Sequence, residues 1–228
     1  GRDDALDFEI SIDETATPTE PAQHFYIASE LLARGVKPAT IAPRFCGEFQ
    51  KGIDYIGDLA AFEREIETHA EIAREYGYKL SIHSGSDKFS VFPIIARHVG
   101  GQFHLKTAGT SWLEAMRVTA IADPALYRAT HAKALASFTE AKKFYHVTTN
   151  IGNVPPLDSL CDSALPELFE NPDARQLIHI TYGFILGDGM LKERLYALWR
   201  RERRAYSDAL SAHIGRHLAL ITGKPLRG

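Results

Sequence analysis

Short apolar segments that alternate with longer amphipathic segments are the feature that most restricts how this chain can fold. Six segments have the length and composition of β-strands, namely 5–13, 39–45, 78–84, 101–107, 143–150 and 176–183. The amphipathic segments between them, such as 58–77, carry apolar residues at helical spacing and end in glycine. A strand followed by a helix, six times over, predicts an α/β fold with a parallel sheet.

Apolar and polar side chains alternate along most of the expected strands, so each strand has one apolar and one polar face. In 78–84, Leu80 and Ile82 share one face. Ser81 and His83 share the other. A doubly wound sheet is covered by helices on both faces and favours strands that are apolar throughout. A TIM (β/α)8 barrel packs only its outer face on helices and carries polar side chains inside, so the pattern favours the barrel.

The number of expected strands is too small for a complete barrel. Such a barrel has eight strands and usually about 250 residues or more, whereas this chain has 228 residues. We therefore expect one partial barrel domain over 1–228, with about six βα units. The two N-terminal units would come from a missing part of the polypeptide or from a second chain. The irregular segment 150–173 is long enough to cover a site.

Charge and cysteine content argue against several classes of protein. The 26 basic and 29 acidic residues give a net charge of -3, so no nucleic-acid partner is expected. No apolar run in the sequence is long enough to span a bilayer, so no membrane partner is expected either. Cys46 and Cys161 have no metal-type spacing and no disulfide framework. This cysteine usage favours a cytoplasmic location.

Four histidines occupy equivalent positions near the ends of four successive expected strands. They are His83, His104, His146 and His179, each on a polar face. Imidazole nitrogen is a common ligand for zinc, manganese, iron and nickel, and a barrel would bring the four rings together. One strand histidine by itself is more often a hydrogen-bonded interior residue. Four in the same phase favour a catalytic metal site.

Charged residues and a small polar loop follow the same strand ends. The carboxylates are Asp13, Glu48 and Asp87, and the cations are Arg44, Lys88 and Lys106. Arginine and lysine suit the carboxylate of an acidic sugar, although ion pairs with Glu48 and Asp87 would also explain them. The loop SGSD (84–87) offers hydroxyl groups that can bond sugar hydroxyls.

Longer phrases of the sequence resemble a known family. The phrases that carry the resemblance are HSGSDKFSVFP (83–93), HLKTAGTSWLEAMR (104–117), EISIDETATPTEP (9–21) and APRFCGEFQKGIDYIGD (42–58). They are similar to the tagaturonate epimerase family, and the similarity covers essentially the whole chain. The resemblance implies an isomerase that interconverts tagaturonate and fructuronate in hexuronate breakdown and depends on a divalent metal. It also implies a longer N-terminal part, in agreement with the two missing βα units.

The chemistry of these two sugar acids restricts the mechanism, because they are 2-ketoses that differ at C4. C4 is β to the ketone, so its proton is not acidic and simple deprotonation would fail. Retro-aldol cleavage of C3–C4, rotation of the aldehyde and re-addition would invert C4, with a metal acting as Lewis acid and an acid/base group moving the hydroxyl proton. Transient oxidation at C4 needs a nicotinamide, and the sequence has no dinucleotide-binding fingerprint.

Strand phase assigns roles within this chemistry. The expected metal ligands are His83, His146, His179 and Asp13, for zinc, manganese, nickel or iron. The expected catalytic residues are Glu48, Asp87 and Lys106, with Glu48 and Asp87 as the acid/base candidates. The expected substrate contacts are Arg44, Ser84, Lys88 and His104, with Arg44 and Lys88 on the uronate carboxylate. Replacing His146 or His179 by alanine is expected to abolish metal binding and activity together.

Two alternative functions stay open. A metal-dependent aldolase or ketose isomerase could use the same barrel, and product analysis separates these enzymes from an epimerase. An aldolase releases fragments, and an isomerase shifts the carbonyl group. An incomplete barrel could also be a non-catalytic sugar-acid-binding or partner subunit, which would be expected to bind no metal.

Overall fold

The computed structural model describes residues 7–107 and 109–224, which form two compact units. Unit 1 consists of 7–49, 54–107 and 217–224, and unit 2 of 50–53 and 109–216. Residues 5 and 6 of the first expected strand lie outside the described residues. The single partial barrel domain expected over the whole chain stays a prediction.

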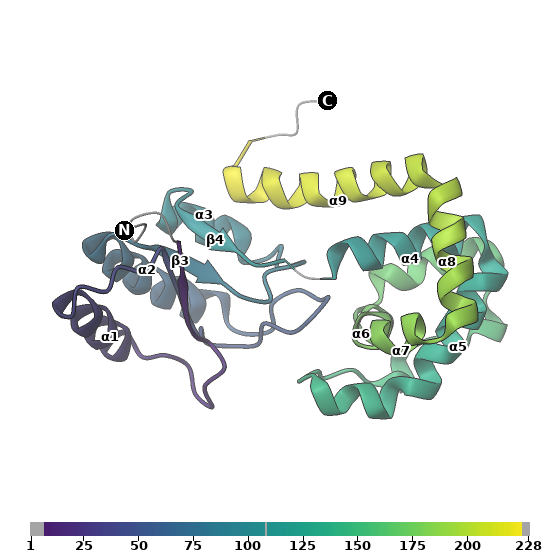
Figure 1. Ribbon diagram of the computed structural model, residues 1–228, viewed down its shortest axis with the longest axis horizontal. Helices are drawn as coiled ribbons and strands as arrows, with labels where there is room; N and C mark the ends of the chain where they lie inside the picture. The colour runs from purple at the N-terminus through teal and green to yellow at the C-terminus, as the bar shows by residue number, and fades with distance from the viewer. Residues whose placement is uncertain (1–6, 108, 225–228) are drawn as a thin grey trace, which may run out of the picture. The chain divides into compact units, whose positions relative to one another are not determined.

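Unit 1 is built on a four-stranded parallel sheet in the order β1-β2-β3-β4 (Figure 1). The strands are β1 (Glu9–Ile12), β2 (Thr40–Pro43), β3 (Lys79–Ile82) and β4 (Phe103–Leu105). In the register, Glu9 lies opposite Thr40, and Leu80 lies opposite Phe103. Each strand lies inside a segment that its sequence predicted, so the first four strands and the parallel sheet are confirmed.

Three helices pack on one face of this sheet. They are α1 (Pro21–Ala33), α2 (Leu59–Tyr76) and α3 (Phe92–Val99). The buried core between helices and sheet includes Ile41, Phe62, Ile66, Leu80 and Ile95. Since β1, β3 and β4 each direct alternate residues into this core, their remaining side chains lie on the opposite, polar face. The predicted alternation of apolar and polar faces is thereby confirmed in unit 1.

The residues at the two ends of α2 explain where this helix begins and ends. The Asp58 side chain accepts hydrogen bonds from the amides of Ala60 at 2.8 Å and Ala61 at 3.2 Å. Gly77 then ends the helix with a φ of 76°, a conformation that glycine adopts without steric cost. These are the start and stop residues that the sequence predicted.

Unit 2 is helical in the described residues. Its helices are α4 (Thr110–Ala122), α5 (Pro124–Ala141), α6 (Pro172–Ile180), α7 (Tyr182–Gly187), α8 (Gly189–Arg201) and α9 (Arg203–Thr222), of which α9 continues into unit 1. Short 3₁₀ helices are η2 (Lys142–Phe144), η3 (Ile151–Asn153), η4 (Leu157–Ser159) and η5 (Asp162–Glu170). The core includes Leu113, Met116, Tyr127, Phe169 and Leu177.

The expected strand at 143–150 is wrong. It begins in the 3₁₀ helix η2, and its later residues are bonded to side chains rather than to a neighbouring strand. The Thr148 amide and hydroxyl donate to Gln50 Oε1 at 2.9 and 3.0 Å. The Asn150 amide donates to Asp173 Oδ1 at 2.7 Å. Side-chain acceptors therefore satisfy this extended backbone in place of a strand ladder.

The expected strand at 176–183 is also wrong, because most of it belongs to α6. Asn171 caps this helix by accepting from the Ala174 amide at 3.0 Å, and Pro172 is its first residue. All residues from 176 to 180 are buried. A helix that is buried on every side loses the period that would distinguish it from a buried strand.

These corrections leave an α/β protein whose described sheet has four strands rather than six. The α/β class is confirmed, and the complete barrel stays a prediction. Over residues 7–107 and 109–224, no helix has the length and apolar character required to cross a membrane.

Candidate functional site

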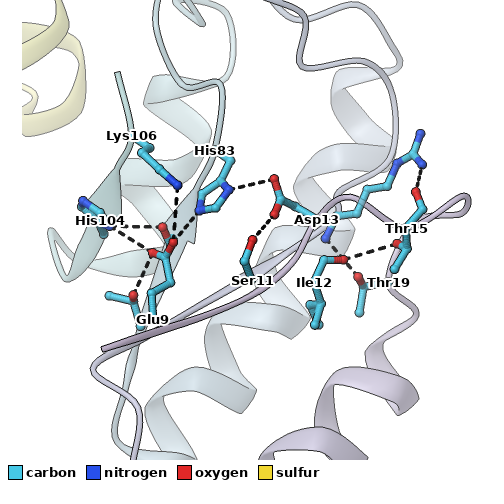
Figure 2. A network of polar contacts seen from close by, with 12 residues as sticks. Glu9, Ser11, Ile12, Asp13, Thr15, Thr19, His83, His104 and Lys106 are labelled. Carbon is cyan, nitrogen blue, oxygen red and sulfur yellow. Dashed lines mark hydrogen bonds and ion pairs between the residues drawn. The ribbon is translucent and has the colours of Figure 1, made fainter. Parts of the chain in front are cut away.

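Glu9 is the centre of a polar network on the open face of the sheet, by which we mean the polar face opposite α1, α2 and α3 (Figure 2). Its Oε2 accepts from Thr40 Oγ1 at 2.8 Å and lies 3.2 Å from His104 Nδ1. Its Oε1 lies 2.7 Å from His83 Nε2 and 3.8 Å from Lys106 Nζ. The carboxylate thus joins β1 to β2 and to the ends of β3 and β4.

His83 lies between two carboxylates. Its Nε2 contacts Glu9, and its Nδ1 lies 2.8 Å from Asp13 Oδ2. Asp13 also accepts a hydrogen bond from Ser11. These contacts on both ring nitrogens hold the plane of the imidazole in one orientation. The side chains of His83 and Asp13 are 13% and 19% exposed, so they are accessible without being fully solvated.

The pKa of Glu9 shows how strongly this network favours negative charge. Partial burial by itself raises the pKa of this carboxyl, but hydrogen bonds from Ser81, Thr40, His83 and His104 outweigh it and lower the pKa to about 2. Such a carboxylate is a weak proton acceptor near neutral pH. Glu9 is therefore an anchor for its neighbours rather than a general base.

The loop after β3 is held in an uncommon backbone conformation. Ser84 and Asp87 have positive φ values of 48° and 64°. A side chain at Gly85 would place its Cβ 2.4 Å from Leu105 Cδ1, so the Leu105 side chain would have to move to accommodate any other residue there. Such conformations persist only where the surrounding structure enforces them, and they concentrate at functional sites.

Two charged residues of this loop are buried. Asp87 is 3% exposed, and its amide donates to His217 Nε2 at 3.0 Å. Lys88 is fully buried, and its Nζ donates to the Ser86 carbonyl at 3.0 Å. The ammonium group of Lys88 is thus directed into its own loop.

Arg44 and Glu48 lie on the segment that follows β2. The guanidinium of Arg44 donates to the carbonyl of Thr15, and its amide donates to Thr19 Oγ1 at 3.0 Å. Glu48 forms an antiparallel bridge with Ile56, with N–O distances of 2.8 and 3.2 Å. Arg44 is therefore tied to the segment after β1, which also carries Asp13.

The other two histidines of the expected set belong to unit 2 and are not on strands. His146 is exposed in the segment after η2. His179 is a buried residue of α6. A Cβ at Gly109 would lie 1.9 Å from His179 Nε2, so the ring packs directly on the backbone there. The expected strand positions of these two residues are wrong, and their ligand roles stay predictions.

Glu9 is the site residue that the sequence-based assignment missed. It shares the polar face of its strand with Ser11 and Asp13, so the alternation did contain a signal. The signal was weak, because Glu9 is at the start of the strand whereas catalytic groups of barrels gather near the carboxyl ends. Its reach toward His83 and His104 depends on the strand register.

A cavity of about 760 Å³ opens at the amino ends of the strands and reaches Glu9 and His104. Its other lining residues include Arg74, Lys79 and Gln102. The loop 84–88 and Asp13 are at the opposite ends of the strands. We place the candidate site at the carboxyl ends, because the imidazole and carboxylate groups come together there.

Fold and site together define a class of protein. A parallel sheet with helices on one face, and with converging carboxylate, imidazole and ammonium groups on the other, is typical of α/β enzymes that act on small polar substrates. The family model described as UxaE, tagaturonate epimerase, matches residues 2–221. The chain belongs to this tagaturonate epimerase family.

Individual relatives agree with the family match. A tagaturonate/fructuronate epimerase from Thermotoga maritima is 50% identical over 219 residues, which are 96% of this chain and 46% of that protein. The native crystal structure of fructuronate-tagaturonate epimerase UxaE from Cohnella laeviribosi matches with 54% identity and a TM-score of 0.93. A glycerol complex of the same enzyme matches with a TM-score of 0.94. The match covers 95% of this chain and 46% of the Cohnella chain, so the chain spans about half the length of these relatives.

Proposed function

We propose that this chain carries the reactive site of an epimerase that interconverts tagaturonate and fructuronate at C4, in cytoplasmic hexuronate breakdown. The sugar acid is its small-molecule partner. The family and the names of the relatives support the substrate pair. The observation that carries the proposal is the convergence of Glu9, Asp13, His83, His104 and Lys106 on the open face of one sheet.

Inversion at C4 proceeds in the proposal by retro-aldol and aldol steps. A base removes the C4 hydroxyl proton, the C3–C4 bond breaks, and its electron pair passes to C3 to give an enediolate while C4 becomes an aldehyde. The aldehyde rotates, C3 attacks its other face, and the proton returns to the C4 oxygen. Asp87 and Glu48 are the proposed acid/base groups.

Other residues of unit 1 position the sugar acid in this proposal. Lys106 and His104 both contact Glu9, and each can donate to substrate oxygens. Arg44 is better suited than Lys88 to hold the uronate carboxylate, because the Lys88 ammonium group is fully buried on the Ser86 carbonyl. Ser84 offers a hydroxyl at the strained start of the loop.

A divalent cation is the proposed cofactor, with zinc, manganese, nickel and iron as candidates. The Asp13 Oδ2 and His83 Nδ1 atoms are 2.8 Å apart. Ligand atoms bound at about 2.1 Å lie about 3.0 Å apart in octahedral and about 3.4 Å apart in tetrahedral coordination, so a small separation of this pair would let both atoms bind one ion. Glu9 holds the other ring nitrogen, as carboxylates do behind metal-binding histidines. When bound, the cation would supply Lewis-acid stabilisation of the enediolate charge.

We also propose that further strands complete the sheet. In the described residues, β1 and β4 pair on one edge only. An edge strand presents a row of backbone N–H and C=O groups with which a further strand can pair. The additional strands would come from another part of a longer polypeptide or from a second chain, which agrees with the half-length coverage of the relatives.

The test is conversion of D-tagaturonate by the purified chain with each candidate metal, followed by NMR analysis of the products. We expect fructuronate without fragments. His83→Ala and Asp13→Asn should reduce the rate by at least about a hundredfold. His98→Ala changes a histidine of α3 that pairs with Glu63 at 3.1 Å, and it should leave the rate unchanged. Release of fragments would indicate an aldolase instead. A chain that binds neither metal nor uronate would contradict the proposal.

A further inference from the structure

Both oxygens of Glu9 are engaged by residues of the sheet itself. Oε2 is bonded by Thr40 of β2 at 2.8 Å, and Oε1 by His83 at 2.7 Å. His104 Nδ1 lies 3.2 Å from Oε2 and 3.2 Å from Ser81 Oγ. The side chain of Glu9 is only 22% exposed. A carboxylate with partners on three neighbouring strands has little freedom to change its orientation.

The two carboxylates around His83 differ in how firmly they are held. Glu9 lies within the strand ladder, opposite Thr40 in the register. Asp13 follows the last residue of β1, and it contacts Ser11 and His83. A ligand that enters the site can therefore replace the contact of His83 Nδ1 with Asp13 more easily than the contact of His83 Nε2 with Glu9.

We propose that Glu9 is a positioning residue that sets the orientation and tautomer of two histidines at once. It holds His83 through Nε2, so that Nδ1 is directed toward Asp13, and it fixes the ring of His104 through Nδ1. The proposal rests on the proposed function for the role of His83. It assigns Glu9 no direct contact with the substrate.

The test uses the full chain with ¹⁵N-labelled histidine, free of metal, and long-range ¹H–¹⁵N correlation spectra that report the tautomer of each ring. Glu9→Gln preserves size but offers only one acceptor oxygen, so it cannot serve both His83 and His104. We expect altered tautomer populations for at least one of these rings. We also expect a fall in Zn²⁺ affinity of about 10- to 100-fold, as for other residues that orient metal-binding histidines.

The matched control is Glu65→Gln. Glu65 is also a carboxylate of unit 1 beside a histidine, with Oε1 3.7 Å from His69 Nε2, but it belongs to α2 on the covered face of the sheet. This variant should leave the signals of His83 and His104 unchanged. Glu9→Ala should show larger changes than Glu9→Gln, with far-UV circular dichroism as the check that each variant is folded.

Unchanged ring signals of His83 and His104 in Glu9→Gln would overturn the proposal. A lower melting temperature in that variant would not rescue it, because Glu9 would then stabilise the fold without positioning the two rings. The outcome is separable from the proposed function. If the tautomers change as expected but the wild-type chain binds no metal and converts no uronate, the positioning of His83 stands and the epimerase proposal fails.

Discussion

His24 is the residue whose chemistry most clearly ties stability to pH. Its Nδ1 lies 2.8 Å from His69 Nδ1, and its Nε2 lies 2.6 Å from the Tyr78 hydroxyl. Burial, followed by the proximity of His69, lowers the pKa of His24 from 6.5 to about 3. Between these values the unfolded chain binds a proton that the folded chain excludes, so stability falls as the pH drops below about 6.5.

We expect the free energy of unfolding to fall by about 2–3 kcal/mol between pH 7 and pH 4.5 through this residue. Urea unfolding at the two pH values measures the change. In His24→Gln the protein should be less stable at pH 7 but should lose less on acidification. His98→Gln is the control, because it makes the same substitution at a less buried histidine of unit 1 and retains His24, so it should lose more stability on acidification than His24→Gln does. Equal pH dependence in His24→Gln and the wild type would refute the assignment.

At the residue scale, the sequence also located much of the candidate site. The alternation in β1 and β3 placed Asp13 and His83 on the polar face, where the structure has them 2.8 Å apart. Glu9 was missed, because its importance comes from strand register, which brings Thr40 opposite it. Strand register is set by packing between strands, so it cannot be deduced from the sequence of one strand alone.

At the element scale, prediction succeeded where local signals were unambiguous and failed where burial was complete. Asp58 and Gly77 define both ends of α2, and the structure uses both. Residues 176–181 are all buried, so burial does not mark one face of this helix, and the sequence pattern could be taken for a strand. The segment that follows η2 is held by contacts of Thr148 and Asn150 with the side chains of Gln50 and Asp173, which are distant in sequence and could not be anticipated.

Substitution of Gly109, the residue before α4, tests the backbone conformation and the close packing at this position. It has a φ of 80°, and a Cβ there would lie 1.9 Å from His179 Nε2. Gly109→Ala combines backbone strain with a clash and should destabilise unit 2 by about 2–4 kcal/mol. Gly183→Ala is the matched control, since nothing lies within 4 Å of its Cβ and it is within α7. That variant should be neutral or slightly stabilising. Similar urea midpoints for the two variants would contradict the packing described for His179.

At the scale of the whole molecule, the sequence predicted an α/β fold and a partial barrel, and the described residues confirm a four-stranded parallel sheet with helices on one face. It wrongly expected two strands, 143–150 and 176–183, within the helical unit 2, because a fully buried helix such as α6 lacks the period that distinguishes it from a buried strand. The partial barrel was predicted from the number of expected strands together with the chain length, and the chain covers about 46% of the length of its relatives.

The predicted ligand roles of His146 and His179 also belong to this scale, because both residues are in unit 2. If they are ligands, His146→Ala and His179→Ala should each remove bound metal and activity together. Metal analysis of the purified variants, beside His98→Ala, measures this directly. Full metal content in both variants would exclude the pair from the ligand set and leave His83 and Asp13 as the remaining candidates.

The most direct test of the central claim is a Zn²⁺ titration of the ¹⁵N-histidine-labelled chain, followed ring by ring in NMR spectra. If Asp13 and His83 hold the metal, with the His83 ring oriented by Glu9, stoichiometric Zn²⁺ should shift the His83 Nδ1 signal, and addition of tagaturonate should shift it again. His24 and His69 are buried residues of α1 and α2, and their signals should not change. A titration that leaves His83 Nδ1 unchanged while other histidines respond would contradict the claim.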